Sequence, residues 1–209
     1  MLSIKILERR DKYKRDFLWR HNPNPYRIMI AEFMLQRTRA EQVEPVYKQF
    51  LKEFPNIRKL ANAPLKKIGK YTAKLGLHKR AKRFINAARF ITKEFNGKIP
   101  DTPDELLMIP GIGEYVAGAI LTVCFNKKYP VVDSNIARFM NRYYGLRLTG
   151  EIRRKKEIKQ LAGRLFNIRN PGKLLFALID FTALICKPQI ANCKKCVIRQ
   201  KCNFSKFKN

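Results

Sequence analysis

Four cysteines near the C-terminal end of the sequence are spaced like the ligands of a single metal centre. Cys186, Cys193, Cys196 and Cys202 follow the pattern C-x6-C-x2-C-x5-C. Closely grouped thiolates bind either Zn²⁺ or a [4Fe–4S] cluster, because both prefer soft sulfur ligands. A zinc site more often repeats two C-x2-C pairs, and this sequence has only one. The pattern predicts a metal centre and favours the cluster, with zinc as the alternative.

Two carboxylates, Asp133 and Glu32, lie beside apolar residues in the sequence, where a charged side chain is unusual. Asp133 follows the apolar run 129–132 and precedes an expected helix, so it suits the helix N-cap position. A carboxylate there can also stabilise positive charge on a reacting group and activate water, and the two roles are compatible. Glu32 lies on the apolar face of an expected helix, where burying an unpaired charge is costly. That cost favours a functional role for Glu32 over a solvated surface position.

The segment 106–117 has the pattern of a helix, a tight turn and a second helix. Pro110 ends the first helix, and Gly111 and Gly113 permit backbone angles and close approaches that a side chain would block. The second helix then begins with N–H groups that point outward, which suits a DNA phosphate. Such a contact holds the DNA backbone without reading the base sequence. An ordinary turn between two helices is the alternative, since Pro-Gly-x-Gly alone is common.

Helical periodicity dominates the rest of the chain, and alternating runs of β-branched residues are scarce. We expect helices over residues 3–19, 57–61, 64–71, 79–95, 103–108, 114–124, 134–144, 153–166 and 171–184. Residues 26–54 are expected to form one helix, or two with a break near 38–41. Pro23 and Pro25 separate this segment from the first helix. The sequence therefore predicts an all-α protein.

The charge balance points to a polyanionic partner. The chain has 45 Lys and Arg against 16 Asp and Glu, a formal net charge of +29. A compact protein this basic repels itself, so the excess favours nucleic acid, with a ribosomal protein or a binder of anionic membranes as alternatives. Charges interrupt the N-terminal residues, and no stretch approaches a membrane span. We therefore expect a soluble, cytoplasmic, nucleoid-associated prokaryotic protein that makes no membrane contact and acts as a monomer.

The stretch from Leu106 to Asp133 resembles the helix-hairpin-helix and downstream aspartate of the endonuclease III superfamily of DNA glycosylases. The resemblance covers about residues 17–204. It implies a two-lobed, all-α fold that grips double-stranded DNA holding a mismatched or damaged base. It also implies that Asp133 is the catalytic aspartate and that the four cysteines hold a C-terminal [4Fe–4S] cluster. The two lobes would comprise residues 23–129, which include the hairpin, and residues 1–22 with 130–209.

Tyr115 decides between two branches of that superfamily. In the bifunctional members, a lysine in the second helix of the hairpin attacks the sugar, and the resulting Schiff base cuts the strand. Here the matching position, two residues after Gly113, holds Tyr115, which cannot form a Schiff base. The chain thus resembles the archaeal thymine-DNA glycosylases that act on T/G and U/G mismatches. The alternative is that Tyr115 only packs.

The segment 25–38 also resembles the adenine glycosylase of A/G mismatches and its thymine-specific relatives. By that resemblance Glu32 is the acid that donates a proton to adenine, or a hydrogen-bonding partner of a flipped thymine or of water. Gln36 matches the residue that fills the hole left by a flipped base. Arg37 and His78 are expected to contact the opposite strand, and a surface phosphate contact, or none, is the alternative for both.

Two departures separate the chain from the adenine enzyme. That enzyme usually continues into a second domain, whereas this chain ends at Asn209, and it usually has a small hydroxyl residue in place of Tyr115. We therefore predict a monofunctional glycosylase of thymine or uracil opposite guanine, with Asp133, Tyr115 and Glu32 converging at a cleft between the lobes. The rival hypotheses are adenine excision, a bifunctional glycosylase/lyase, and a protein that only binds DNA.

Overall fold

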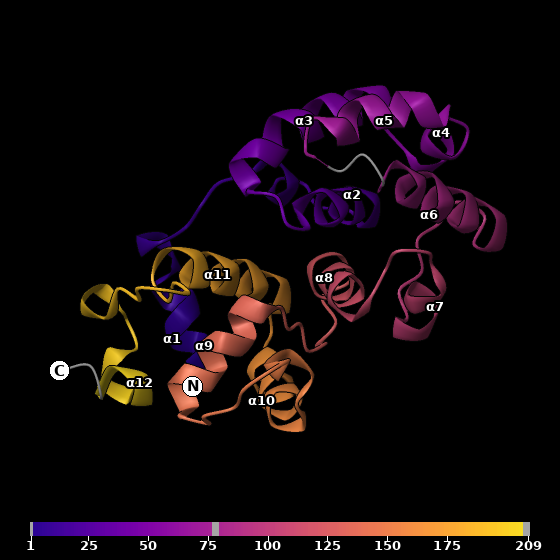
Figure 1. Ribbon diagram of the computed structural model, residues 1–209. Helices are drawn as coiled ribbons and strands as arrows, with labels where there is room; N and C mark the ends of the chain where they lie inside the picture. The colour runs from indigo at the N-terminus through magenta and orange to yellow at the C-terminus, as the bar shows by residue number, and fades with distance from the viewer. Residues whose placement is uncertain (1, 77–79, 207–209) are drawn as a thin grey trace. The chain divides into compact units, whose positions relative to one another are not determined.

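The computed structural model describes residues 2–76 and 80–206, and every regular element within these ranges is a helix. Figure 1 shows these helices in chain order. The predicted all-α class is therefore confirmed. Within the same ranges, none of the helices is long and apolar enough to cross a membrane.

The chain divides into two compact units. Unit 1 comprises Met1–Arg15 and Asn126–Asn209, and unit 2 comprises Asp16–Phe125. The predicted boundaries lay at 22/23 and 129/130, so both junctions fall earlier in the chain than expected. The first junction falls early because the residues just after Arg15 contact a helix of unit 2.

Unit 2 is a group of helices around an aromatic core. Phe84 packs edge-on against Phe33 with 5.3 Å between ring centres, and its ring centre lies 5.5 Å from that of Phe50. All three side chains are fully buried. The elements of unit 2 are η2 (Leu18–Arg20), α2 (Pro25–Leu35), α3 (Ala40–Glu53), α4 (Ile57–Ala61), α5 (Leu65–Ala73), α6 (Ala81–Glu94), α7 (Pro103–Met108) and α8 (Glu114–Cys124).

Residues just after Arg15 are attached to unit 2 rather than to unit 1. The Trp19 ring packs edge-on against Tyr47 of α3, with 5.6 Å between ring centres. The Leu18 N–H donates a hydrogen bond to Glu44 Oε1, also on α3, at 2.8 Å. Because both contacts are made with α3, the segment that carries them belongs to unit 2.

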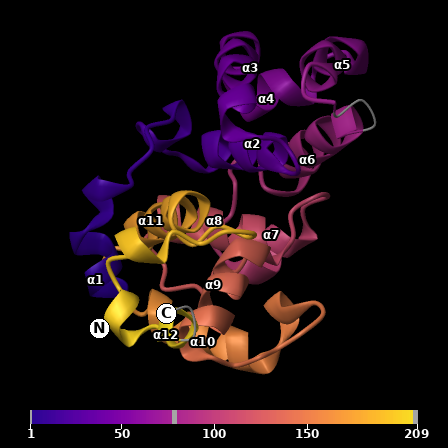
Figure 2. The same ribbon diagram turned by 60° about the vertical axis from the view of Figure 1, so that its left-hand side comes forward.

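Unit 1 combines the N-terminal helix with the C-terminal part of the chain. Phe181 of α11 lies at its centre, with ring centres of Phe139 and Tyr13 at 5.4 and 5.5 Å. Helix α1 lies beside α11 in both views (Figure 1 and Figure 2). The elements of unit 1 are α1 (Leu2–Glu8), η1 (Arg10–Lys12), α9 (Ser134–Tyr144), η4 (Ile152–Arg154), α10 (Lys156–Phe166), α11 (Pro171–Leu184), η5 (Cys193–Lys195), η6 (Arg199–Lys201) and α12 (Asn203–Lys206).

The prediction of a first helix over residues 3–19 is wrong, because α1 ends at Glu8. Asp180, whose side chain is 2% exposed within α11, accepts hydrogen bonds from the backbone N–H and the Nε of Arg15, at 3.0 and 2.8 Å. In a helix, the Arg15 N–H would donate to the carbonyl four residues earlier. The buried ion pair uses this donor instead and holds the chain in a non-helical path.

Residues 26–54 form two helices, as one of the two expectations allowed. Helix α2 ends at Leu35 and α3 begins at Ala40, so the break covers residues 36–39. At its other end, α2 is capped by Asn24, whose Oδ1 accepts a hydrogen bond from the Arg27 N–H at 2.9 Å. These two ends fix the length of the helix that carries Glu32.

Candidate active site and four-cysteine loop

The predicted hairpin is present between α7 and α8. The Ile112 N–H donates to the Ile109 carbonyl at 3.0 Å, and Gly111 has φ +89°, which together give a type II turn with Pro110 at its second position. Gly113 is the N-cap of α8 at φ −110°, and no side chain caps this helix. A Cβ atom at Gly113 would meet no atom within 4 Å, so the space there is open. This open N-terminus suits a phosphate oxygen.

Glu32 and Tyr115 lie on two helices that pack against each other, α2 and α8. Glu32 is 9% exposed, and its neighbours Ala31 and Phe33 are buried. Tyr115 is the second residue of α8 and is half-buried. The expected burial of Glu32 is therefore confirmed. The catalytic roles of the two residues stay predictions.

Gln36 and Arg37 occupy the turn that follows α2. The Thr38 N–H donates to the Leu35 carbonyl at 3.3 Å, Gln36 has φ −63° and ψ 107°, and Arg37 has φ +63°. The Arg37 side chain is exposed and that of Gln36 is half-buried. Both side chains are thus available at the end of α2. The remaining residue predicted to contact DNA, His78, lies outside the described residues.

Asp133 is the N-cap of α9, which confirms one of its two expected roles. Its Oδ1 accepts a hydrogen bond from the Ile136 N–H at 2.7 Å, and its Oδ2 accepts one from Asn135 Nδ2 at 3.0 Å. The side chain is half-buried. Donors from the first turn of α9 therefore fix the direction of both carboxylate oxygens.

Arg138 connects the neighbour of Asp133 to the four-cysteine loop within unit 1. Its Nη1 donates to Asn135 Oδ1 at 2.8 Å, and its Nη2 donates to the Cys186 carbonyl at 2.9 Å. Burial lowers the pKa of Arg138, although an arginine in a protein stays charged. A continuous chain of hydrogen bonds thus runs from Asp133 through Asn135 and Arg138 to the first cysteine.

The four cysteines line one small cavity together with aromatic and aliphatic side chains of unit 1. Arg142 of α9 contacts two of them: its Nη1 lies 3.8 Å from Cys186 Sγ, and its carbonyl oxygen lies 4.0 Å from Cys202 Sγ. The same guanidinium donates to the Lys187 and Pro188 carbonyls, both at 2.6 Å. Arg142 therefore holds the loop at its first cysteine.

The thiols have the chemical type of a metal cluster's ligands, and all four line the same cavity. Burial raises the pKa of the Cys186 thiol, and it raises the pKa of Cys196 to about 11. Bound metal would favour the thiolate form of each ligand. In the part of the chain that the structure describes, no three His, Cys, Asp or Glu side chains are grouped tightly enough to hold a metal ion. The loop brings four thiols to one cavity without arranging them around one point.

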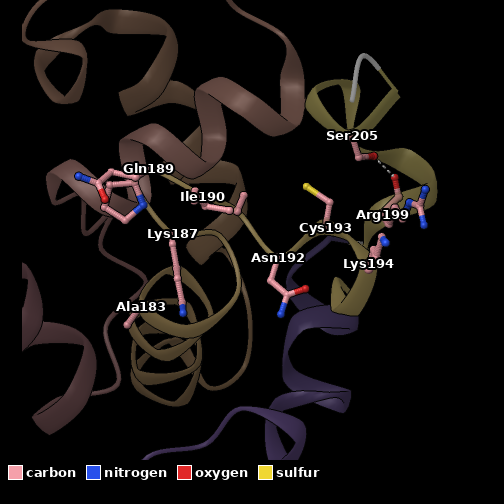
Figure 3. Close-up of a pocket in the computed structure, with 11 residues that line it drawn as sticks. Ala183, Lys187, Gln189, Ile190, Asn192, Cys193, Lys194, Arg199 and Ser205 are labelled. Atoms are coloured by element: carbon pink, nitrogen blue, oxygen red, sulfur yellow. Dashed lines mark hydrogen bonds between the residues drawn. The ribbon is translucent and has the colours of Figure 1, made fainter. Parts of the chain in front are cut away.

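A wider hollow of about 770 Å³ lies beside the same loop (Figure 3). Three cations, Lys187, Lys194 and Arg199, contribute to its lining, and Ile190 in the same lining is 78% exposed. Ser205 Oγ donates to the Arg199 carbonyl at 2.6 Å, drawn as a dashed line in Figure 3. The loop is thus basic on its accessible surface.

The structure therefore groups the predicted residues in two sets. Glu32, Tyr115 and Gln36 belong to unit 2, together with the hairpin, and Asp133 belongs to unit 1, together with the four cysteines. The convergence of Asp133 with Glu32 and Tyr115 stays a prediction.

Comparison with known families identifies the chain. Residues 30–167 match the HhH-GPD superfamily of base excision DNA repair proteins, and this range contains Glu32, Tyr115 and Asp133. The chain belongs to this superfamily. It is accordingly a DNA glycosylase, a hydrolytic glycosidase whose partner is DNA. The four cysteines lie beyond the matched range.

Similar sequences in this superfamily carry two different names. The chain is 32% identical over 192 residues to the thymine/uracil-DNA glycosylase of Methanothermobacter thermautotrophicus, covering 91% of this chain and 87% of that protein. It is 36% identical over 184 residues to the adenine DNA glycosylase of Buchnera aphidicola subsp. Baizongia pistaciae, covering 88% and 52%. The chain spans about half the length of the Buchnera adenine glycosylases that it matches.

Solved structures of glycosylases match nearly the whole chain. A thermostable thymine-DNA glycosylase superimposes with a TM-score of 0.89 at 30% identity, covering 99% of this chain and 95% of that one. A trapped covalent intermediate of endonuclease III with DNA superimposes with a TM-score of 0.81 at 19% identity. The second match shows that the two proteins share the fold.

Sequence reasoning missed the side chains that hold the predicted site residues. Asn135 and Arg138 follow Asp133 closely, and two arginines beside Gln36, Arg80 and Arg83, contact it. Arg138 reaches Cys186, and Arg80 and Arg83 reach Gln36, across more than 40 residues of sequence, so local pattern gives no sign of these contacts. In a chain with 45 Lys and Arg, a cation beside an apolar helix face is also a weak signal.

Proposed function

We propose that this glycosylase hydrolyses the N-glycosidic bond of thymine or uracil opposite guanine in double-stranded DNA and leaves the abasic site uncut. The observation that carries the proposal is Tyr115 in the second position of α8, directly after the hairpin turn. A phenol cannot form the Schiff base through which a lysine at this position would cut the strand. The identity of 32% over 91% of the chain with a thymine/uracil-DNA glycosylase supports the same substrate.

Asp133 is the proposed catalytic carboxylate. Breaking the bond to the base builds positive charge on the sugar, and a carboxylate that is already oriented stabilises this charge without further reorganisation. The Ile136 N–H and the Asn135 amide orient its two oxygens in the free protein. The same carboxylate can then take the proton of the water that adds to the sugar.

Glu32 is the proposed partner of the flipped base. Its near-complete burial on α2 keeps competing water away, so a hydrogen bond to the base counts strongly for recognition. Thymine and uracil share an N3–H donor that an ionised carboxylate accepts. Neither base has an N7 to protonate, so Glu32 would bind the base rather than act as its proton donor.

We also propose that Cys186, Cys193, Cys196 and Cys202 hold a [4Fe–4S] cluster. The shared cavity of the four thiols supports this assignment over scattered free cysteines. A bound cluster would supply a cross-link between four points of the loop, and the loop carries the Cys186 carbonyl that Arg138 contacts. Purified protein should contain iron and sulfide in equal amounts, whereas zinc without sulfide would contradict the cluster.

A 5′-labelled duplex with one T/G or U/G mismatch tests the proposed function. The labelled strand should break only after alkali treatment, because the enzyme removes the base and leaves the backbone intact. Breakage without alkali, or a covalent adduct trapped by borohydride, would contradict the monofunctional assignment. An intact strand after alkali on both duplexes would contradict the proposed substrate.

Adenine excision from A/G mismatches is the second candidate, and the buried Glu32 together with the 36% identity to an adenine DNA glycosylase favours it. Glu32→Gln separates the two. Loss of a proton donor would lower adenine excision by roughly 10²- to 10⁴-fold. Loss of one charged hydrogen bond would lower thymine or uracil excision by only about tenfold, since an amide still reaches the base. Single-turnover excision rates of the wild type and of Glu32→Gln on T/G and A/G duplexes decide between the two candidate functions.

A further inference from the structure

The turn that carries Gln36 has an unfavourable backbone. Residues Leu35 to Thr38 form a type II turn, closed by the Thr38 N–H on the Leu35 carbonyl. Its third residue requires φ > 0, a position that glycine normally fills, and here Arg37 fills it at φ +63°. Such a conformation costs a residue with a side chain about 1–2 kcal/mol. Contacts from outside the turn must therefore hold it.

Two arginines make those contacts, one at the N-cap of α6 and one inside that helix. Arg80 Nη1 donates to the Gln36 backbone carbonyl at 2.9 Å, so it holds the peptide of the turn. Arg83 Nη1 donates to Gln36 Oε1, so it holds the side chain itself. The two contacts differ in kind, because only the second one selects a side-chain rotamer.

Arg83 is itself fixed against the hairpin. A Cβ atom placed on Gly111 would lie 2.7 Å from Arg83 Cδ and closer still to Cγ, so the stem of Arg83 crosses directly over this glycine. The guanidinium carbon lies 5.8 Å from the centre of the Phe33 ring, within the range of a cation–π contact. Burial and the neighbouring charge of Arg80 lower the pKa of Arg83. Arg83 is therefore a packed residue with a defined place and differs from a solvated surface cation.

We propose that Arg83 is a positioning residue that sets the Gln36 side chain at a fixed offset from the hairpin turn. By their predicted roles, the hairpin binds the DNA backbone and Gln36 fills the gap that the flipped base leaves. Because Arg83 contacts both, it keeps the Gln36 side chain at a constant position relative to the hairpin turn. Holding Gln36 in one rotamer before DNA binds removes an entropy cost that a free glutamine side chain would meet in the gap. The inference rests on the proposed function in that a base is flipped out, whichever base that is, and on the predicted roles of Gln36 in the gap and of the hairpin at the DNA backbone.

Binding to a duplex with a permanent gap tests this role without any excision. One duplex holds a tetrahydrofuran abasic analogue opposite guanine, and the control duplex is fully paired. Wild-type protein should prefer the gapped duplex, and Arg83→Met should reduce that preference about five- to tenfold. Lys82→Met is the matched control, because it removes the same charge from an exposed position of the same helix. It should weaken binding to both duplexes equally and leave the preference unchanged.

Gln36→Ala completes a double-mutant cycle. If Arg83 acts through Gln36, the double variant should lose no more preference than Gln36→Ala alone. Additive losses would overturn the inference, as would equal behaviour of Arg83→Met and Lys82→Met. If Arg83→Met melts well below the wild type, Arg83→Lys gives the decision, since it keeps the stem and the charge but loses the planar fork. Arg83→Lys should lose part of the preference when Gln36 is present and cause no further loss when it is combined with Gln36→Ala.

The outcomes for the wild type separate this inference from the proposed function. No preference of the wild type for the gapped duplex would overturn the gap-filling role of Gln36 and with it the role of Arg83, whereas the proposed excision of thymine or uracil stands or falls with the excision assay alone. A wild-type preference that survives Arg83→Met would overturn the role of Arg83 alone. A stacking-sensitive fluorescent base next to the gap adds a direct reading, since its signal should change less in Arg83→Met than in Lys82→Met.

Discussion

Arg138 in unit 1 and Arg83 in unit 2 have similar surroundings, but Arg138 donates to a backbone carbonyl as well as to a side-chain amide, whereas Arg83 donates to a side-chain amide. Each is half-buried on a helix, and burial lowers the pKa of each. Arg138 donates to the Cys186 carbonyl and to Asn135, which in turn holds Asp133. Arg83 donates to the side-chain amide of Gln36, at the end of a flexible chain.

The difference indicates how rigid each region needs to be. The Cys186 carbonyl cannot leave Arg138 without a movement of the loop backbone, and Asn135 also donates to the N-cap carboxylate of Asp133, so the region around Arg138 is held at several points. The amide of Gln36 can leave Arg83 by a rotamer change alone. The region proposed to perform the chemistry is therefore held through the backbone, whereas the Gln36 side chain, which is proposed to enter the DNA, is held in one rotamer by a side-chain contact that it can exchange.

Asp133→Asn should have the largest effect, because it removes the carboxylate that is proposed to act on the sugar. Asparagine caps helices as well as aspartate does, so melting should stay close to that of the wild type. The charge that stabilises the sugar is lost, and single-turnover excision should fall by roughly 10³-fold or more. Excision that persists within about tenfold of the wild type would remove Asp133 from the chemistry and leave it a helix cap.

Arg138→Met should lower excision by about 10- to 100-fold, as loss of a supporting contact to a reactive group commonly does. Arg142→Met is its matched control. Arg142 holds the same loop through the Lys187 and Pro188 carbonyls, and its guanidinium has no hydrogen bond to Asn135 or Asp133 among the contacts that link Asp133 to Cys186. Arg142→Met should loosen the loop and lower the melting temperature, and it should lower excision less than Arg138→Met does. Equal losses in both variants would mean that the loop matters and its connection to Asp133 does not.

Substitution of either hairpin glycine should have a smaller effect, and the two substitutions should change different properties of the protein. Gly111→Ala places a Cβ at φ +89° against the stem of Arg83, so it should cost about 1–3 kcal/mol of stability and reduce the preference for gapped DNA. Gly113→Ala has an ordinary φ and open space, so stability should change by less than about 1 kcal/mol. Its methyl group faces the predicted phosphate position, and affinity should fall equally for all duplexes. Melting temperatures and affinities for gapped and fully paired duplexes check both predictions. Equal changes in the two variants would contradict them.

Local chemistry explains what could be predicted from the sequence. The hairpin turn uses Pro110 and Gly111 at the two positions where a type II turn favours them, and Asp133 is a common N-cap residue. The turn at Gln36 and Arg37 has the same backbone type with unfavourable residues, so its sequence gives no such sign. Its shape depends on arginines far along the chain, at positions 80 and 83.

The error in the first helix has a related cause. The periodicity of residues 3–19 is compatible with a helix, and no residue before Pro23 forbids one. Helix α1 ends at Glu8, and further along the chain the buried carboxylate of Asp180 accepts the Arg15 N–H, so the backbone around Arg15 takes a non-helical path. A tertiary ion pair thus overrides local helical propensity around Arg15, and the first junction between the units precedes the predicted one because Leu18 and Trp19 contact α3.

The most direct test of the central claim is the single-turnover excision rate on duplexes that differ only in the mismatched base. With guanine opposite, T and U should be removed at least about 10²-fold faster than A, because the base pocket is proposed to be built for the N3–H edge. All cleavage should appear only after alkali. Faster removal of A than of T and U would contradict the account and place the chain with the adenine glycosylases.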